Sequence, residues 1–358
     1  MNAATWPRHD PRSTRLLHID PERGAFEDCA IGDLRELLEP GDLLVVNDAA
    51  TLPSSLRGST ASGDGVEVRL AGEREDGTWN AVLFGPGDWR IQTEKRPEPS
   101  RVGSGDTIGF GDVSATVERV DSESPRLVTL AFDASGARLW TRLYRAGRPV
   151  QYAYTAAPLA LWHVQTAYAS RPWAVEAPSA GFVLTWDLLL ALRRRGVGVA
   201  RITHAAGLSS TGDAALDARL PLAERYEITE ETVRAVGAAK AGGGRVVALG
   251  TTVARALESA AVVGGGRLVA SRGTTELRLG PGAPPRVVDG IVTGVHEAET
   301  SHFALLEAFA PRELLDAAHA HADTVGYMGH EFGDTVLVLA GTRGAPRGQR
   351  GATTKAHP

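Results

Sequence analysis

The sequence predicts an α/β fold, in which a barrel-like α/β main domain carries an inserted small antiparallel β-barrel. Short β-rich apolar runs and helix-like segments alternate near both ends of the chain, whereas the middle contains short alternating strands and little helical pattern. The 358 residues are enough for two or three domains. We expect a discontinuous main domain of residues 1–57 and 151–340, an inserted β-barrel domain of residues 58–150 and a disordered tail of residues 341–358.

The first part of the chain predicts a strand, a helix and a second, buried strand. Residues 11–20 contain an apolar-centred strand candidate, and residues 31–38 have helical spacing. The apolar run of residues 42–46 predicts a buried strand with Asn47 and Asp48 at its carboxyl end. Because α/β folds place ligand-handling side chains at such strand ends, these two residues are site candidates. A simple Asx turn is the equal alternative.

Residues 56–154 differ in character from both flanks. Short alternating segments are separated by turn signals rich in Gly, Pro, Asp and Ser. Several short strands at a spacing of ~8–12 residues indicate a small antiparallel barrel or sandwich. The strand candidates are residues 66–70, 78–84, 114–120 and 126–132.

After this insertion, helices and strands alternate again. Thr185 is a good N-cap for a helix over residues 186–195, whose last turn carries three arginines that complement the helix dipole. These arginines are most simply a solvated helix end, and a nucleic-acid contact is the alternative. Residues 197–202 predict a strand that ends close to His204, and residues 229–240 predict a helix.

Residues 244–258 predict a buried strand that turns directly into a helix. The apolar run of residues 245–249 stops at Gly250, and Thr251 and Thr252 are good N-cap residues for the following helix. Such a junction leaves backbone N–H groups unpaired at the positive end of the helix dipole, where a carboxylate or phosphate can bind. A capped turn without a ligand is the alternative.

The last part of the chain predicts three strands and two helices. His296 follows the second of these strands, near its carboxyl end. The strands are expected at residues 277–279, 286–292 and 334–339, and the helices at residues 303–309 and 313–322.

The composition excludes several classes of protein. The formal net charge of −5 provides no overall positive field, so nucleic-acid binding would need a local patch. A single cysteine, Cys29, excludes an internal disulfide framework and a multi-cysteine zinc site. We find no signal peptide, no apolar run of the ~18 residues that span a bilayer and no metal-ligand spacing. We therefore expect a cytoplasmic protein that binds neither membrane nor metal, and we favour a monomer.

Six stretches of the chain carry a family resemblance. They are STRLL at 13–17, GDLLVVND at 41–48, QTAYA at 165–169, APSAGF at 177–182, GRVVALGTTVARALESAA at 244–261 and VVDGIVTGVH at 287–296. Together, in order and spacing, they resemble the S-adenosylmethionine:tRNA ribosyltransferase-isomerase family of queuosine biosynthesis. The GTT-x-x-R-x-LE block and the AP-S/T-AG turn are the most specific of these motifs.

The resemblance implies a fold and a reaction. The implied fold is a large α/β barrel-like domain with a small β-barrel inserted near residues 58–150, as the strand pattern indicates independently. In the implied reaction, S-adenosylmethionine is a co-substrate that donates its ribosyl group, after a base removes a 5′ hydrogen beside the sulfonium. The ribosyl group is transferred to a 7-aminomethyl-7-deazaguanine in tRNA and isomerised. The products are epoxyqueuosine, adenine and methionine, and no metal is required.

The resemblance also implies which residues bind S-adenosylmethionine. Two hydroxyls at a helix N-terminus and a guanidinium one turn later suit the methionine carboxylate, namely Thr251, Thr252 and Arg255. A tight turn allows the backbone to approach the nucleoside and offers an aromatic ring to adenine, through Pro178, Ser179, Ala180, Gly181 and Phe182.

Three ionisable residues are the implied catalytic candidates. Asp48 and His296 lie at strand ends, and His204 is kept in the segment that corresponds to the family's LHVG-x-GTF motif. A base role suits His296 because the unperturbed pKa of histidine is near ~6.5. A structural histidine is the equal alternative at this position.

The chain departs from the family pattern in ways that leave two other functions open. The family's NDTR turn reads NDAA at residues 47–50 and lacks the arginine, and its HxMHxE pattern has lost both histidines at residues 220–226. The TNFH motif has become TGVH at residues 293–296. One alternative is a divergent paralogue that uses S-adenosylmethionine on a small-molecule acceptor or cleaves it. The other is a non-catalytic homologue that binds S-adenosylmethionine or RNA.

Overall fold

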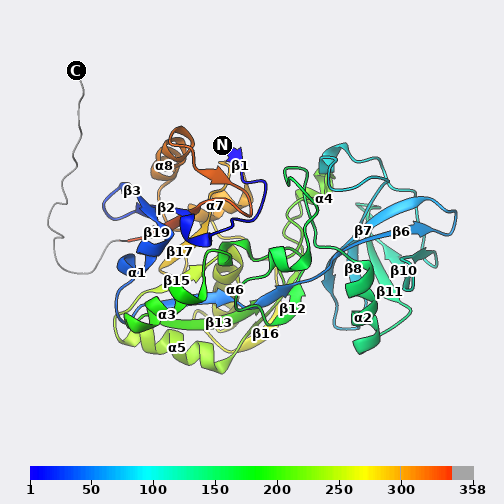
Figure 1. The fold of residues 1–358 in the computed structure, drawn as a ribbon. Helices are drawn as coiled ribbons and strands as arrows, with labels where there is room; N and C mark the ends of the chain where they lie inside the picture. The colour runs from blue at the N-terminus through cyan, green and yellow to red at the C-terminus, as the bar shows by residue number, and fades with distance from the viewer. Residues whose placement is uncertain (299, 341–358) are drawn as a thin grey trace, which may run out of the picture.

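The computed structural model describes residues 1–298 and 300–340, and its main element is a nine-stranded sheet. Figure 1 shows this sheet with its helices on the left and a smaller β-barrel on the right. The sheet ends in two different edge strands, so its hydrogen bonds do not close it into a barrel. In spatial order the strands are β16 (Ser271–Thr275), β14 (Glu224–Ile228), β13 (Gly198–His204), β4 (Leu43–Asn47), β15 (Val246–Leu249), β17 (Gly290–Gly294), β19 (Thr335–Leu339), β2 (Arg15–Asp20) and β3 (Ala25–Ala30).

The centre of the sheet is parallel and covered by helices on both faces. β13, β4, β15 and β17 run parallel to one another. Along β15, Val246 and Ala248 pack into one core, whereas Val247 and Leu249 pack into the other, because successive side chains point to opposite faces. The first core includes residues of α5 (Glu230–Ala241), α6 (Thr251–Val263), α7 (Ser301–Leu306) and α8 (Arg312–Thr324), and the second those of α1 (Leu34–Leu37) and α3 (Trp186–Arg194).

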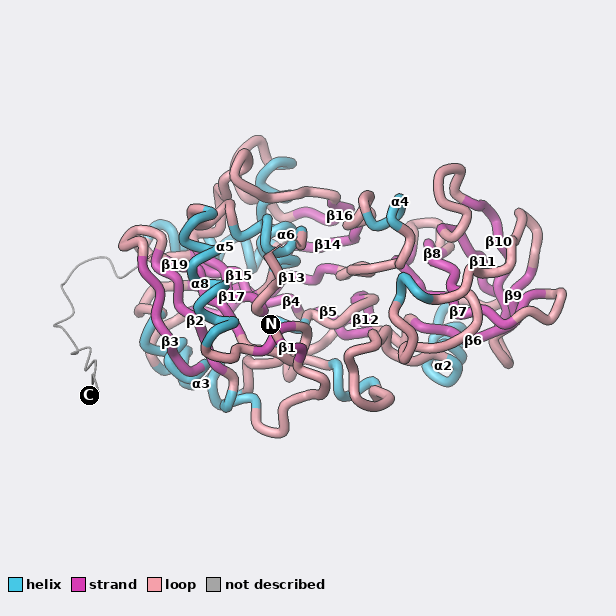
Figure 2. The backbone as a smooth tube through the Cα atoms, turned by 90° about the horizontal axis from the view of Figure 1, so that it is seen from above, coloured by secondary structure: helices cyan, strands magenta, loops and turns pink. Residues whose placement is uncertain are grey.

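A closed six-stranded antiparallel barrel is inserted after the first strands of the main domain. Trp79 and Phe110 fill its core, and Leu139 and Leu143 of α2 (Gly136–Ala146) join them. Figure 2 shows the barrel beside the main domain. The predicted fold class, an α/β main domain with an inserted small β-barrel, is confirmed. The barrel strands are β6 (Ser55–Thr60), β7 (Gly65–Glu73), β8 (Trp79–Phe84), β9 (Thr107–Gly109), β10 (Ser114–Val120) and β11 (Leu127–Phe132).

Two short strand pairs lie outside the large sheet and the barrel. β1 (Asn2–Ala3) pairs with β18 (Met328–Gly329), and β5 (Ala49–Thr51) pairs with β12 (Arg171–Ala174). The predicted tail of residues 341–358 lies outside the described residues. None of the helices in the described ranges combines the length and apolar character that a membrane span requires. The remaining short helices are η1 (Pro11–Ser13), η2 (Ile31–Asp33), η3 (Thr93–Lys95), η4 (Leu161–Val164), η5 (Ser179–Gly181) and α4 (Ala214–Asp217).

Near the end of the chain, one strand prediction was wrong and another strand starts later than predicted, because side chains of α6 bind the backbone there. Residues 277–279 form no strand, and Nε of Arg255 donates to the carbonyl oxygen of Leu277 at 2.9 Å. β17 begins only at Gly290, since the carboxylate of Glu258 accepts hydrogen bonds from the N–H groups of residues 286–288. These backbone groups are therefore satisfied outside the sheet ladder.

The predicted capping of α6 was also wrong. The N-cap of this helix is Gly250, and Thr251 and Thr252 are its first two helical residues. Thr185, in contrast, caps α3 as predicted, because its side chain accepts a hydrogen bond from the N–H of Leu188 at 3.3 Å.

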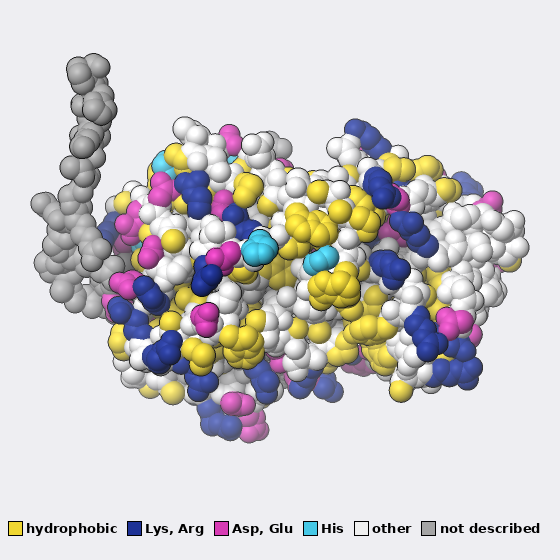
Figure 3. Space-filling model, in the orientation of Figure 1, with side chains coloured by type: hydrophobic (Ala, Val, Ile, Leu, Met, Phe, Trp, Pro, Cys, Tyr) yellow, Lys and Arg dark blue, Asp and Glu magenta, His cyan; other side chains and the backbone are white. Residues whose placement is uncertain are grey.

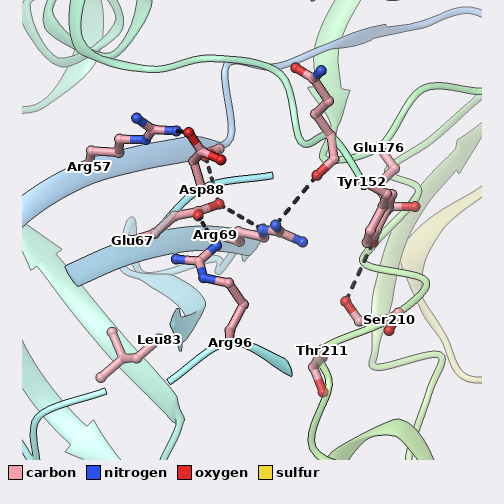
Figure 4. A network of polar contacts seen from close by, with 12 residues as sticks. Arg57, Glu67, Arg69, Leu83, Asp88, Arg96, Tyr152, Glu176, Ser210 and Thr211 are labelled. Carbon is pink, nitrogen blue, oxygen red and sulfur yellow. Dashed lines mark hydrogen bonds and ion pairs between the residues drawn. The ribbon is translucent and has the colours of Figure 1, made fainter. Parts of the chain in front are cut away.

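A buried polar network joins the barrel to the main domain (Figure 4). Glu67 of β7 accepts hydrogen bonds from Arg69 at 2.8 Å and from Arg96 at 2.6 Å. Burial opposes ionisation of Glu67, yet the charges of the two arginines hold the pKa of this carboxyl below its ordinary value. Arg69 also donates to the carbonyl oxygen of Gln151 at 3.4 Å, and its guanidinium lies 5.2 Å from the ring of Tyr152. The network thus fixes the barrel against the segment that leads back into the main domain.

Candidate active site

The β15–α6 junction and the turn at residues 177–182 pack directly on one another. Gly250 has φ 96°, a conformation that other residues rarely adopt, and its N–H donates to the carbonyl oxygen of Val292 at 2.7 Å. A Cβ atom on Gly250 would lie 3.4 Å from the Cβ of Ala180. The structure therefore brings together two segments that the sequence analysis assigned to the same ligand.

Asn47 connects this junction to two neighbouring strands. Its side-chain oxygen accepts hydrogen bonds from the N–H groups of His204 at 2.9 Å and Ala49 at 3.1 Å. Its side-chain nitrogen donates to the carbonyl oxygen of His204 at 2.9 Å and reaches Oγ1 of Thr252 at 3.5 Å. The contact with Ala49 has the Asx-type spacing weighed in the sequence analysis, and the other contacts join β4 to β13 and α6.

Next to this junction, Arg255, Glu224 and His204 form a buried polar cluster. Nη1 of Arg255 lies 2.5 Å from Oε2 of Glu224, and Nε2 of His204 lies 3.5 Å from the same oxygen. Within the described residues, Nη2 of Arg255 and both ring nitrogens of His204 are buried without a hydrogen-bond partner. Because buried polar groups are normally hydrogen-bonded, these atoms indicate that a polar ligand or ordered water binds here.

Burial shifts the ionisation of the cluster. Burial and the nearby charge of Arg255 hold the pKa of His204 well below its ordinary value, so the imidazole is neutral near pH 7. Burial raises the pKa of Glu224, although the charge of Arg255 opposes this shift. A guanidinium, a neutral imidazole and a carboxyl with a raised pKa can bind a zwitterionic group or exchange a proton with it.

Asp48 and His296 lie close to the same edge of the sheet but make separate contacts. Asp48 is 5% exposed and accepts a hydrogen bond from Oγ1 of Thr203 at 2.6 Å. Nε2 of His296 lies 2.8 Å from Oγ1 of Thr293, and its ring stacks on His302 with centroids 4.8 Å apart. Burial and the neighbouring histidines hold the pKa of His296 well below its ordinary value.

Phe182 and the preceding turn border a cavity of about 240 Å³. The ring of Phe182 stacks on Phe332 with centroids 5.7 Å apart, so one of its two faces is already covered. His330 and Glu331 also line this cavity, and a smaller cavity of about 30 Å³ shares Glu331 with it. Figure 3 shows histidine and hydrophobic side chains gathered on one face, between the main domain and the barrel.

Comparison with known proteins assigns this architecture to a family. The family model described as a queuosine biosynthesis protein matches residues 2–338. This chain belongs to that family. Two relatives with the name S-adenosylmethionine:tRNA ribosyltransferase-isomerase show the extent of the similarity. The protein of Anaeromyxobacter dehalogenans (strain 2CP-C) is 37% identical over 334 residues, which is 91% of this chain and 92% of the relative. That of Methylobacterium sp. (strain 4-46) is 38% identical over 359 residues, or 92% and 93%.

A solved structure is similar to this member of the queuosine biosynthesis family along most of its length. It is the crystal structure of an S-adenosylmethionine tRNA ribosyltransferase from Thermotoga maritima, with a TM-score of 0.52 and 24% identity. The match covers 94% of this chain and 96% of that one, and it shows that the two share a fold.

Within this queuosine biosynthesis protein, the predicted site residues fall into two groups. Ser179, Ala180 and Phe182 line the larger cavity. Pro178 and Gly181 belong to the same turn, and a Cβ atom on Gly181 would lie 2.3 Å from the hydroxyl of Tyr168. The second group surrounds the β15–α6 junction and lines neither cavity, and it consists of Thr251, Thr252, Arg255, Asp48, His204 and His296.

Glu224, Glu331 and Tyr154 were not predicted from the sequence. Glu224 lies in the segment compared with the HxMHxE pattern, and that comparison considered only the two lost histidines. Glu331 is the single carboxylate of the GHEFG turn before the last strand, a position without periodicity. Within the described residues, no group of three or more His, Cys, Asp and Glu side chains could hold a metal ion.

Proposed function

We propose that this protein is an S-adenosylmethionine:tRNA ribosyltransferase-isomerase. It would transfer the ribosyl group of S-adenosylmethionine to a 7-aminomethyl-7-deazaguanine in cytoplasmic tRNA and isomerise it, giving epoxyqueuosine, adenine and methionine. Relatives with this name cover more than nine-tenths of the chain. The structural observation that carries the proposal is the set of buried, unpartnered polar atoms on Arg255 and His204 beside the junction.

In this proposal, the β15–α6 junction holds the amino-acid end of S-adenosylmethionine. Nη2 of Arg255 has no partner within the described residues and suits one carboxylate oxygen. The hydroxyls of Thr251 and Thr252 lie at the start of α6, where the helix dipole favours an anion. The turn at residues 177–182 packs against Gly250 and would shape the nucleoside side of the same site.

His296 is our candidate for the base that removes the 5′ hydrogen. Its lowered pKa keeps the imidazole neutral, so it can accept a proton, and Thr293 orients the ring through Nε2. The C–H bond would break as an N–H bond forms, leaving the electron pair on the carbon beside the sulfonium. Asp48 and His204 complete the set of ionisable groups for the later steps, in which charge develops and adenine and methionine leave.

The experiment that tests the function measures product release from S-adenosylmethionine. The purified protein is incubated with S-adenosylmethionine alone, with tRNA carrying 7-aminomethyl-7-deazaguanine, and with the same tRNA carrying guanine at that position. We expect adenine, methionine and epoxyqueuosine only with the deazaguanine tRNA. An His296→Asn variant should lose at least about 100-fold in kcat, the usual scale for general-base catalysis.

The same experiment separates the two alternatives. Release of adenine and methionine without tRNA would indicate a paralogue that cleaves S-adenosylmethionine or transfers its ribosyl group to a small molecule. Binding of S-adenosylmethionine by calorimetry without any product would indicate a non-catalytic homologue. Either outcome would overturn the proposed function.

A further inference from the structure

We propose that the 240 Å³ cavity receives the acceptor nucleotide, with Trp162 stacking on an RNA base at its rim and Glu331 binding the primary amine inside it. This inference rests on the proposed function, whose acceptor is an RNA base that carries an aminomethyl group. It assigns the acceptor to a different place from the junction that would hold S-adenosylmethionine. Ala180 connects the two places, because it lines the cavity and packs against Gly250.

The rim of the cavity presents exposed aromatic side chains. Trp162 lines the cavity and is 77% exposed, which is unusual for a large apolar ring. The His163 ring lies between two tryptophans, with centroids 5.5 Å from Trp162 and 4.9 Å from Trp6. Exposed aromatic rings are the platforms on which proteins stack unpaired RNA bases.

Inside the cavity, Glu331 is held by an aromatic residue of another segment. The hydroxyl of Tyr154 donates to Oε2 of Glu331, and the Tyr154 ring lies 4.1 Å from the ring of His330. His330 has φ 66° and is the one non-glycine residue with positive φ in the described part of the chain. Strained backbone of this kind concentrates at functional sites, where surrounding contacts maintain it.

The charge environment of Glu331 favours a cationic ligand. Burial raises the pKa of its carboxyl to about 7, because the carboxylate anion is poorly solvated there. A bound cation would replace the missing solvation and stabilise the anion. Arg8, which lines the larger cavity, is already paired with Asp334 at 2.6 Å. The other titratable groups that line the two cavities or flank Glu331 are His163, Tyr152, Tyr154, Glu176, His330 and Asp334.

A carboxylate in this position has a chemical task in the reaction. The acceptor amine is nucleophilic only after its ammonium form loses a proton. Transfer to Glu331 breaks an N–H bond, forms an O–H bond on the carboxyl and leaves the lone pair on nitrogen free to attack. Burial lowers the pKa of the ammonium and raises that of the carboxyl, so it reduces the pKa difference that opposes this proton transfer.

The test measures tRNA affinity at pH 8, independently of turnover. Two tRNAs are compared, one with 7-aminomethyl-7-deazaguanine and one with guanine at that position. We expect the wild-type protein to prefer the amine by about tenfold or more, the scale of one charged hydrogen bond. Glu331→Gln should reduce this preference below about threefold. Trp162→Ala should lower the affinity for both tRNAs by about tenfold, because base stacking does not depend on the amine.

Matched variants control for charge and for exposed tryptophan. Glu313→Gln on α8 removes an exposed carboxylate, and Trp186→Ala on α3 removes a tryptophan that is 59% exposed, and neither residue lines the cavity. Both should keep wild-type affinity for the two tRNAs. Unchanged preference in Glu331→Gln, or unchanged affinity in Trp162→Ala, would overturn the inference. Failure of the wild-type protein to release adenine would instead refute the proposed function.

Discussion

Nη1 of Arg255 on α6 lies 2.5 Å from Oε2 of Glu224 on β14, and both side chains are almost fully buried. The guanidinium thus belongs both to the candidate ligand site and to the contact that joins a central helix to the antiparallel edge of the sheet. A role in binding and a role in folding must therefore be separated by experiment.

Removal of Arg255 alone should destabilise the protein. We expect Arg255→Ala to lower the free energy of unfolding by about 3–5 kcal/mol, because it leaves the Glu224 carboxylate buried without its partner. The double variant Arg255→Met with Glu224→Gln should recover most of this loss. Urea unfolding of the two variants and the wild-type protein measures the difference, and a cost below about 1 kcal/mol for Arg255→Ala would contradict a buried ion pair.

The double variant also tests whether Arg255 binds ligand. It should fold yet bind S-adenosylmethionine with about 1.5–3 kcal/mol less free energy, the scale of a charged hydrogen bond. Isothermal titration calorimetry gives the Kd of both proteins. An unchanged Kd would remove Arg255 from the binding site.

Replacement of Gly250 should disturb the junction. Gly250→Ala would cost about 1–3 kcal/mol in stability, because φ 96° with ψ 154° suits glycine alone. The new methyl group itself would make only an ordinary van der Waals contact with Ala180 at 3.4 Å, so we expect the backbone shift at the start of α6 to weaken S-adenosylmethionine binding. Gly265→Ala is the matched control, since Gly265 has φ 66° but open space around it. It should lose stability without any change in Kd, and an equal loss of binding in both variants would argue against a ligand site at the β15–α6 junction.

Glu258 should prove structural rather than catalytic. Its carboxylate accepts hydrogen bonds from the N–H groups of Arg286, Val287 and Val288 at 2.8, 2.9 and 3.0 Å. Glu258→Gln keeps the size and shape of the side chain but removes its negative charge. We therefore expect the free energy of unfolding to fall by about 1.5–3 kcal/mol. Thermal unfolding together with calorimetry checks this prediction. A weaker S-adenosylmethionine affinity in a fully folded variant would place Glu258 in the site instead.

The pH dependence of stability reports on Glu331 without any ligand. Its pKa is about 7 in the folded protein and near 4.5 when unfolded, so the folded state binds more protons between these values. The stability that this carboxyl contributes is present below pH 4.5 and is lost as the pH rises through 7. Relative to wild type, Glu331→Gln should therefore gain stability between pH 4.5 and pH 7. The histidines are common to both proteins, so their contributions largely cancel, and a flat difference in urea unfolding would contradict the raised pKa.

Local patterns were sufficient to predict the elements around the β15–α6 junction. The apolar run before Gly250 and the helix formers after it predict the strand and the helix, and alternation of apolar residues predicts four of the six barrel strands, but not β6 and β9. These signals depend on neighbours in the chain. The wrong strand at residues 277–279 shows the limit, because Arg255 binds that backbone from a helix more than 20 residues earlier.

The candidate site could be predicted only in part. Family motifs indicated Arg255 and the turn at residues 177–182, and the structure packs that turn against Gly250. Glu331 carried no local signal, since a single carboxylate in an irregular segment is normally solvated. Glu224 begins β14, and the pattern compared at residues 220–226 was read only for its lost histidines. The burial and raised pKa values of these two glutamates arise from segments that are distant in sequence.

The sequence by itself determined most of the strands and helices, the insertion of a β-barrel and the glycine that precedes α6, because periodicity and backbone preference act over a few residues. It did not predict β3, β14 and β16 of the large sheet or β6 and β9 of the barrel. Tertiary structure alone decided that Glu224 faces Arg255 and that Tyr154 meets Glu331 beside a cavity. Those pairings depend on which surfaces are buried from solvent when the sheet, its helices and the barrel pack together. Desolvation, which turns an ordinary carboxylate into a binding or proton-transfer group, has no counterpart in the linear chain.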